Sequence, residues 1–386
     1  MQLRSLWINV KLAQTMLALL ALYVSGIACA TTEIPSPPIP HIALLLPLNS
    51  QGLGTSAQAV HQGILAAAGL QSKGLPVRVY SDYDEAHSVT SAYKAAIAGG
   101  AVAVVGPLTR SGISRLANEA SLPVPTLALN IIEGHGPAQL YFFGMAVEAE
   151  ARQIALLARK QGMQQAIVIT SREPLAQRLQ FSFEEQWTRS GGAISREIEY
   201  NGDTTVFADI EASPAGMVFF ATDAEKSRAI RPYLPNNLAA YGTSQLFAGN
   251  KDRMLNFDFD GVRFIDMPWL MREVQPSVAV YPRANPPLAT DLERLYALGI
   301  DAYRLINILI KNQIVTALPL EGVTGRISLN GQTFDREALP AIFVQGHAQS
   351  ADAPVTQAEL MFPDQFRNTS SVIPALPVTA GLPSER

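Results

Sequence analysis

The segment AVAVVGPLTRS, residues 101–111, indicates the class of fold most clearly. Its first five residues are apolar and rich in β-branched side chains, which predicts a strand buried on both faces, as in a parallel sheet. The chain then breaks at Gly106-Pro107 and presents hydroxyl groups at Thr109 and Ser111, where a helix is expected to begin. Ligands and partners meet such sheets at the carboxyl ends of the strands, so this loop is predicted to line a cleft. The alternative is an ordinary strand-to-helix turn.

The same alternation of strand and helix continues on both sides of this segment. Strands are predicted at residues 42–46, 77–82 and 124–129, with helices between them, and this spacing indicates a parallel sheet with right-handed crossovers. The pattern restarts after Gly162, which predicts a second α/β lobe.

The helix with the clearest periodicity is expected over residues 292–310, where apolar residues recur at three- and four-residue steps. We expect this helix to pack on the first lobe, with Asp301 and Arg304 facing solvent. Downstream, an alternating stretch turns at Asn330-Gly331, which is a hairpin signal.

These patterns divide the sequence into five parts. They are a signal peptide at 1–30, a Pro-rich leader at 31–41, a first lobe at 42–145 plus about 285–320, a second lobe at 146–284 plus about 321–348, and a mostly disordered tail at 349–386.

Composition narrows the classes of function. Of 386 residues, 48% are hydrophobic and 16% are charged, which is enough apolar material for large cores. The net charge of −4 argues against nucleic acid as the main partner. The sequence contains one cysteine and no His-Glu-x-x-His, Gly-x-Ser-x-Gly or Gly-x-x-x-x-Gly-Lys motif, so we expect no catalytic residue, metal or cofactor.

The first 30 residues have the form of a bacterial export signal. Basic residues at Arg4 and Lys11 precede a short apolar core at 16–24 and then small residues. Two interpretations stay open: cleavage after Ala30, or lipidation of Cys29 as the first mature residue. The single cysteine of the chain lies at this site, but Gly26 occupies the position where lipoproteins usually carry Leu.

One motif imitates a nucleotide site. Residues 52–57, GLGTSA, match Gly-x-Gly-x-x-Ala between a strand and a helix. The pyrophosphate fingerprint needs its first glycine directly after the strand, and here a loop beginning at Pro47 intervenes. We therefore favour a structural role for Gly52 and Gly54.

Several segments also resemble a known family. RLYALGIDAY at 294–303 is similar to the most characteristic segment of the LppC/LpoA family, the outer-membrane lipoprotein activators of penicillin-binding proteins. Further matching segments follow in the same order over about residues 41–348. They are 42–48, 105–108, 127–130, 143–144, 148–152, 241–244, 266–270 and 322–325.

The resemblance implies a periplasmic-binding-protein type I-like α/β fold: two Rossmann-like lobes, each with a mainly parallel sheet, joined by several crossings. It also implies a non-catalytic periplasmic protein, anchored to the outer membrane through Cys29 if that residue is lipidated, which stimulates a bifunctional peptidoglycan synthase by contact. Longer members carry an N-terminal helical-repeat domain, which this sequence is expected to lack.

The alternative function is a periplasmic solute-binding protein for an amino acid or a cell-wall fragment. Its ligand would need hydroxyls, amides and a carboxylate at the strand ends of both lobes. The candidate cleft residues are Asn49, Ser50, Gln51, Pro107, Thr109, Ser111, Asn130, Thr243, Ser244 and Asp266.

Overall fold

The computed structural model describes residues 38–80, 85–251 and 253–351. The expected signal peptide with Cys29, most of the leader and nearly all of the expected tail lie outside these residues. Within the described part, His41 opens the first strand and Ser350 closes the last. The folded part therefore includes one residue of the expected leader, His41, and two residues of the expected tail, 349 and 350.

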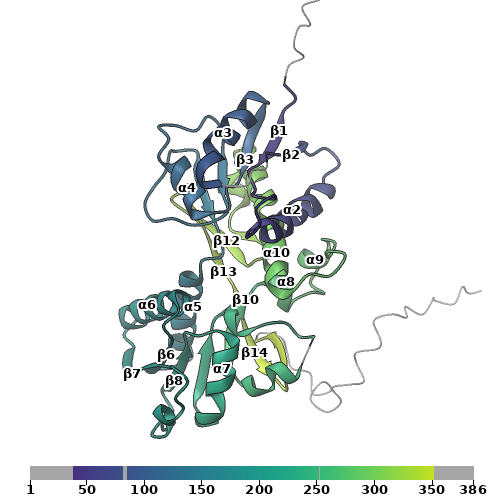
Figure 1. The fold of residues 1–386 in the computed structure, drawn as a ribbon. Coiled ribbons are helices and arrows are strands. Elements are labelled where there is room, and N and C mark those ends of the chain that lie inside the picture. The colour runs from purple at the N-terminus through teal and green to yellow at the C-terminus, as the bar shows by residue number, and fades with distance from the viewer. Residues whose placement is uncertain (1–37, 81–84, 252, 352–386) are drawn as a thin grey trace, which may run out of the picture. The chain divides into compact units, whose positions relative to one another are not determined.

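The first sheet has eight strands in the order β11-β12-β13-β5-β4-β3-β1-β2 (Figure 1). β3 lies between β1 and β4 and is parallel to both, which confirms the arrangement expected from the 101–111 segment. The strands are β1 (His41–Leu44), β2 (Val77–Val79), β3 (Ala101–Val105), β4 (Thr126–Ala128), β5 (Leu140–Phe143), β11 (Leu320–Glu321), β12 (Arg326–Asn330) and β13 (Thr333–Glu337).

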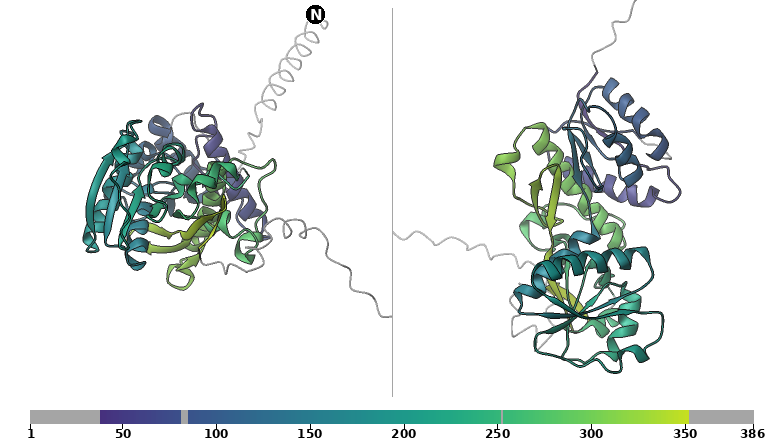
Figure 2. Two further views of the ribbon diagram at one scale, coloured as in Figure 1. Left: turned by 90° about the horizontal axis from the view of Figure 1, so that it is seen from below. Right: turned by 90° about the vertical axis from the view of Figure 1, so that its left-hand side faces the viewer.

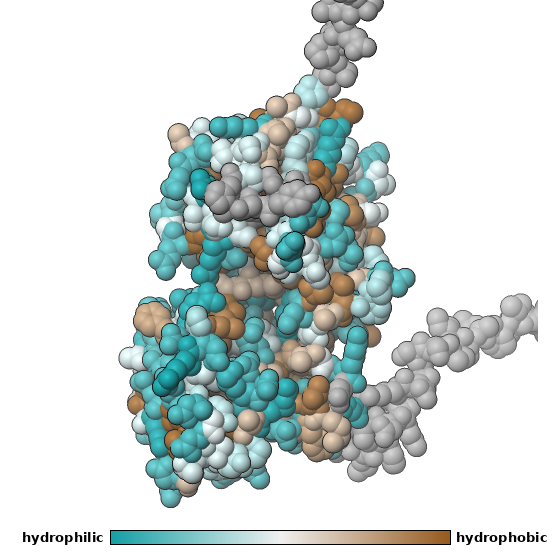
Figure 3. All heavy atoms as spheres, viewed as in Figure 1, coloured by the Kyte–Doolittle hydropathy of each residue, from teal (hydrophilic) through white to brown (hydrophobic). Residues whose placement is uncertain are grey.

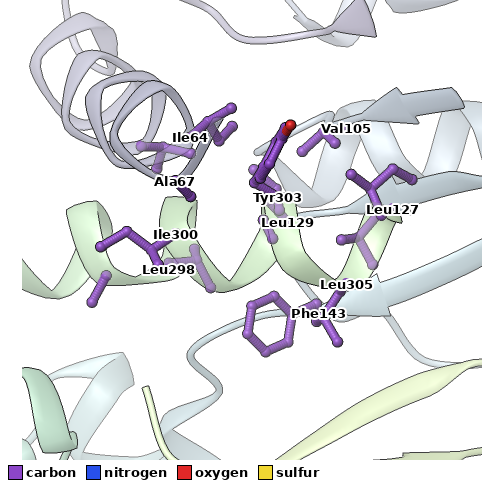
Figure 4. Close-up of a cluster of buried hydrophobic side chains, with 14 of the residues drawn as sticks. Ile64, Ala67, Val105, Leu127, Leu129, Phe143, Leu298, Ile300, Tyr303 and Leu305 are labelled. Carbon is purple, nitrogen blue, oxygen red and sulfur yellow. The ribbon is translucent and has the colours of Figure 1, made fainter. Parts of the chain in front are cut away.

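Helices cover both faces of this sheet. α2 (Gly54–Gly69) and α10 (Thr290–Ile310) share one hydrophobic core with inward-facing strand residues. Figure 4 shows this core, in which Tyr303 and Leu305 of α10 lie toward Val105, Leu127 and Phe143 of the strands. α3 (Glu85–Ala98) and α4 (Arg110–Ala117) cover the opposite face. The short helices α8 (Pro268–Met271), α9 (Pro276–Ala279) and α11 (Ile314–Ala317) pack beside α10.

The second sheet has seven strands in the order β15-β14-β10-β9-β8-β6-β7. They are β6 (Gln165–Thr170), β7 (Ala193–Glu199), β8 (Gly216–Phe220), β9 (Ala239–Gly242), β10 (Arg263–Asp266), β14 (Leu339–Val344) and β15 (His347–Ser350). α5 (Val147–Lys160) and α6 (Pro174–Arg189) cover one face (Figure 2). The other face packs against α7 (Ala224–Ile230) and the 3-10 turns η1 (Thr205–Phe207), η2 (Arg231–Tyr233), η3 (Ser244–Leu246) and η4 (Met254–Phe259).

The chain passes between the two sheets three times. It leaves the first sheet after β5 and enters α5, returns after β10 toward α10, and leaves again from β13 directly into β14. The fold is thus the α/β arrangement of two mostly parallel sheets that the sequence predicts.

The expected assignment of residues 321–348 to the second lobe is wrong for its first half. β11, β12 and β13 belong to the first sheet, where β13 runs parallel to β5. The Asn330-Gly331 hairpin forms as predicted, but a hairpin signal does not specify which sheet the hairpin joins. Similarly, Trp269 and Val278 lie in the first-lobe core, although residues 267–284 were assigned to the second lobe.

Two glycines allow α2 and α10 to cross at close range. A Cβ on Gly63 would lie 1.9 Å from the Tyr296 carbonyl oxygen, and one on Gly299 would lie 2.1 Å from that of Val60. Because both obstacles are backbone atoms, no side-chain rotation relieves them. Gly299, between Leu298 and Ile300, therefore allows the backbone of α10 to approach that of α2 closely.

We expect Gly299→Ala to destabilise the fold by about 3 kcal/mol, since the helices must separate and leave the core underpacked. Urea denaturation checks this value. Gly69→Ala is the matched control, because a Cβ at Gly69 meets nothing within 4 Å. Equal stability of Gly299→Ala and the control would contradict the close crossing.

Candidate functional site

The candidate cleft residues of the first lobe follow the ends of β1, β3 and β4, and four of them make hydrogen bonds within local turns. Thr109 caps α4 by accepting a hydrogen bond from the Gly112 N–H at 3.1 Å, and Ser111 donates to Thr109. Asn130 donates to the Leu108 carbonyl and accepts from the Ile131 N–H. Ser50 accepts from the Leu53 N–H at 3.3 Å. Asn49 and Gln51 are exposed, and Pro107 is buried.

The three candidates of the second lobe are buried. Thr243, Ser244 and Asp266 are 1%, 3% and 1% exposed. Thr243 accepts from the Gln245 N–H at the start of η3. Ser244 and Asp266 are bonded to charged protein groups, Glu150 and Arg294.

Those partners form a buried chain of ionic and hydrogen-bonding groups, here called the junction network: Glu150, Ser244, Asp266, Arg294 and Arg336. Glu150, in the first turn of α5, accepts from the N–H and hydroxyl of Ser244 at 3.2 and 2.7 Å. Its other carboxylate oxygen accepts from Arg336 of β13 at 3.0 Å. A single carboxylate thereby joins α5, η3 and β13.

Arg294 of α10 continues the network from the other side. Its guanidinium donates to both oxygens of Asp266, at 3.2 and 2.6 Å, and to the carbonyl oxygens of Ser244 and Phe247. Ser244 is therefore contacted by Glu150 through its N–H and hydroxyl and by Arg294 through its carbonyl.

The electrostatic environment of Arg294 keeps it charged. Burial by itself would lower the pKa of Arg294, but the charge and hydrogen bonds of Asp266, together with Asp291 and Glu150, raise the pKa above its ordinary value. The Arg294–Asp266 and Arg336–Glu150 pairs are among the least exposed ion pairs of the described residues, with side chains at most 8% exposed. Such pairs are specific in geometry and costly to break on one side.

A second buried carboxylate corrects the expectation that Asp301 faces solvent. Asp301 is 0% exposed and accepts from the backbone N–H groups of Val323 and Thr324, from the Thr324 hydroxyl, and from Arg304. Helical periodicity marks Asp301 as polar but does not show that a loop 22 residues later covers it. The Thr324 carbonyl in turn accepts from Arg336, which connects this carboxylate to the junction network.

The described residues contain several surface cavities, and the four that follow are lined by residues other than the candidate cleft residues. Two of these cavities, of about 700 and 640 Å³, lie where α5 meets β12, β13 and the β13–β14 crossing. A third, of about 440 Å³, lies beside Arg283, and a fourth, of about 340 Å³, lies between α3 and α4.

Within residues 38–80, 85–251 and 253–351, no group of three or more His, Cys, Asp and Glu side chains is placed to hold a metal ion. Nor does any helix in these ranges have the length and apolarity needed to cross a membrane. The apolar residues on the face seen in Figure 3 occur in small groups among hydrophilic ones.

Glu150, Arg294 and Arg336 were not among the candidate residues, and no motif predicted that they lie together. A usable signal was present for Arg294, since a charged residue interrupts the apolar face of the most periodic helix. No sequence signal marked Arg336, because its burial depends on which sheet the Asn330-Gly331 hairpin joins.

We expect Arg294→Met to destabilise the fold by about 3–5 kcal/mol, because it leaves Asp266 buried without its cation. Arg326→Met is the control: its pair with Glu321 spans 3.7 Å between exposed side chains, and such pairs contribute little. Urea denaturation of both variants measures the difference. Similar losses in the two would contradict the role assigned to Arg294.

Comparison with known proteins places this architecture in a family. The chain matches the family model described as LppC putative lipoprotein over residues 33–212 and 206–339. The penicillin-binding protein activator LpoA of Haemophilus influenzae is 28% identical over 302 residues, covering 75% of this chain and 51% of that protein. The chain spans about half the length of the curated relatives it matches.

Two solved structures are similar over nearly their full length. A protein described as a putative branched-chain amino acid ABC transporter from Chromobacterium violaceum is 34% identical with a TM-score of 0.68, covering 79% of this chain and 100% of that one. The C-domain of LpoA (YraM) from Haemophilus influenzae, a regulator of PBP1A, is 26% identical with a TM-score of 0.68, covering 80% and 99%. The family match extends over both lobes, and the chain therefore belongs to the LppC putative lipoprotein family.

Proposed function

We propose that this protein binds a class A penicillin-binding protein, a bifunctional peptidoglycan synthase, and stimulates it without catalysing a reaction itself. Membership of the LppC family carries this proposal, because relatives over most of the chain are named penicillin-binding protein activators. The solved C-domain of one such protein, described as a regulator of PBP1A, corresponds to nearly all of the described chain.

The side chains of the candidate cleft support a role in protein contact over a role in solute transport. A solute-binding cleft requires polar groups that are free to meet a ligand. Here Ser244 and Asp266 are bound to Glu150 and Arg294, while Thr109 and Asn130 fix local turns. These four side chains already make hydrogen bonds or ion pairs within the protein.

We further propose that the protein acts in the periplasm and is attached through a lipid on Cys29 to the inner face of the outer membrane. The export signal and the family's description as a putative lipoprotein support this location. Lipidation also gives the single cysteine of the chain a role.

The purified chain is expected to bind a class A penicillin-binding protein and to increase its glycan polymerisation several-fold. A pull-down measures binding, and conversion of fluorescent lipid-linked precursor measures the rate. A heat-denatured sample of the chain is the control. Absence of both binding and stimulation would rule out the proposed function.

A solute screen distinguishes the alternative. A ligand present at 100 times its Kd adds about 2.7 kcal/mol to the stability of the folded state, which thermal denaturation detects. We expect amino acids and cell-wall peptides to leave the melting temperature unchanged. A saturable increase with one of them would favour the solute-binding protein, a reading to which the similarity with the Chromobacterium violaceum protein gives some weight.

Cys29→Ser is expected to move the protein from the membrane fraction to the soluble periplasmic fraction, because it removes the only thiol that a lipid can modify. Fractionation of cells followed by immunoblotting checks this. Ala30→Ser serves as a control that retains the thiol. An unmodified mature protein beginning at Thr31 in wild-type cells would show that Cys29 is removed with the signal.

A further inference from the structure

The three crossings between the sheets are each bordered by a member of the junction network. Glu150 lies in the first turn of α5, just after the β5–α5 crossing. Asp266 is the last residue of β10, where the chain turns back toward α10 and Arg294. Arg336 lies in β13, shortly before the chain enters β14. All three crossings are therefore tied by one connected set of contacts.

The third crossing is clamped a second time by a neutral side chain. The Gln153 amide donates to the Ala338 carbonyl at 2.6 Å and accepts from the Ala338 N–H at 3.0 Å. Ala338 is the single residue between β13 and β14, and both of its backbone polar groups are thus bound by α5. One face of α5 therefore holds the crossing at two positions: Glu150 binds Arg336, and Gln153 binds Ala338.

This arrangement constrains rotation of one lobe against the other. Any rotation that moves β13 away from α5 must break the Arg336–Glu150 pair and both Gln153–Ala338 hydrogen bonds together. Rotation about the β10 crossing must also separate Arg294 from Asp266 or from Ser244. The side chains of the two ionic pairs, Arg294–Asp266 and Arg336–Glu150, are nearly excluded from water, so water does not readily replace their broken contacts.

We propose that the junction network locks the two lobes into a single arrangement in the absence of any ligand, and that Glu150 is a positioning residue for activation of the synthase. The second part rests on the proposed function. The partner then meets a preformed surface with fixed geometry, and no ligand-driven closure precedes binding. A ligand shifts a conformational equilibrium only when two states exist, and the lock removes the second.

Interlobe distances measured with spin labels test the lock. Cys29→Ser removes the only cysteine, and Lys94→Cys on α3 and Thr188→Cys on α6 then place one label on each lobe at exposed positions. The otherwise unaltered chain is expected to give one narrow distance distribution with and without cell-wall peptides. A broad or two-peaked distribution would overturn the lock.

Substitutions in the network test its cause. Glu150→Gln retains shape but removes the charge that pairs with Arg336, and Gln153→Leu removes both bonds to Ala338. Each is expected to widen the distance distribution at least twofold. Glu185→Gln is the control, since Glu185 lies on α6 and pairs with Arg152 and Arg189, which belong to the same lobe. Unchanged widths in both network variants would show that the network is not the lock.

Stimulation of the synthase separates the two parts of the proposal. Glu150→Gln is expected to lose stimulation at least fivefold while the control retains it. A widened distribution with full stimulation would refute the positioning role and leave the lock intact. If the unaltered chain does not stimulate at all, the proposed function fails and the distances alone decide the lock. Should Glu150→Gln not fold, Gln153→Leu carries the same comparisons.

Discussion

The contact on which the rest of the structure depends is the buried carboxylate of Glu150 between Ser244 and Arg336. Through Ser244 this contact continues to Arg294 and Asp266, so that elements from both sheets share one ionic network. Most of the apolar packing lies within one lobe or the other, because the core clusters of the two lobes contain different strands, and Leu270 packs against a cluster of each. The polar network supplies directional contacts between elements of the two lobes, which apolar packing does not provide. Buried ionic pairs are more often a source of specificity than of net stability, and at this position they specify how the lobes are joined.

The junction network accounts for the polar residues at the strand ends of the second lobe. Parallel strands deliver polar residues to one edge of each sheet, where many proteins of this architecture bind small molecules. In this chain the second-lobe residues at that edge have become acceptors and donors for neighbouring elements. The same positions that would recognise a solute are bonded here to α5 and α10. A surface of fixed shape suits a protein whose proposed role is to contact an enzyme.

Local patterns in the sequence were sufficient for the sheets but not for the network. The apolar run at 101–105 and its counterparts predicted the neighbouring parallel strands β1, β3 and β4, because parallel α/β units are built from consecutive elements. The hairpin at Asn330-Gly331 was also visible, yet its partner β5 lies almost 200 residues earlier, and no local pattern records such pairing. Arg336 and its contact with Glu150 were hidden for the same reason.

Asp301 shows the second limit. On a helical wheel it is a polar residue and is expected to face water, but a loop from 322 to 325 folds over it and supplies two backbone N–H donors. Apolar runs predict where strands end, but no local pattern shows which of the ten candidate cleft side chains are already bonded to other parts of the protein. That distinction depends on partners such as Glu150, which is 94 residues from Ser244.

Hydrogen exchange of the Ser244 amide tests this account most directly, because that N–H is donated to Glu150 inside the network. If the junction does not open locally, this amide exchanges only through global unfolding, and its exchange free energy equals the free energy of unfolding measured by denaturation. Exchange that is much faster, and insensitive to low concentrations of denaturant, would mean that the junction opens while both lobes stay folded, and would contradict the account.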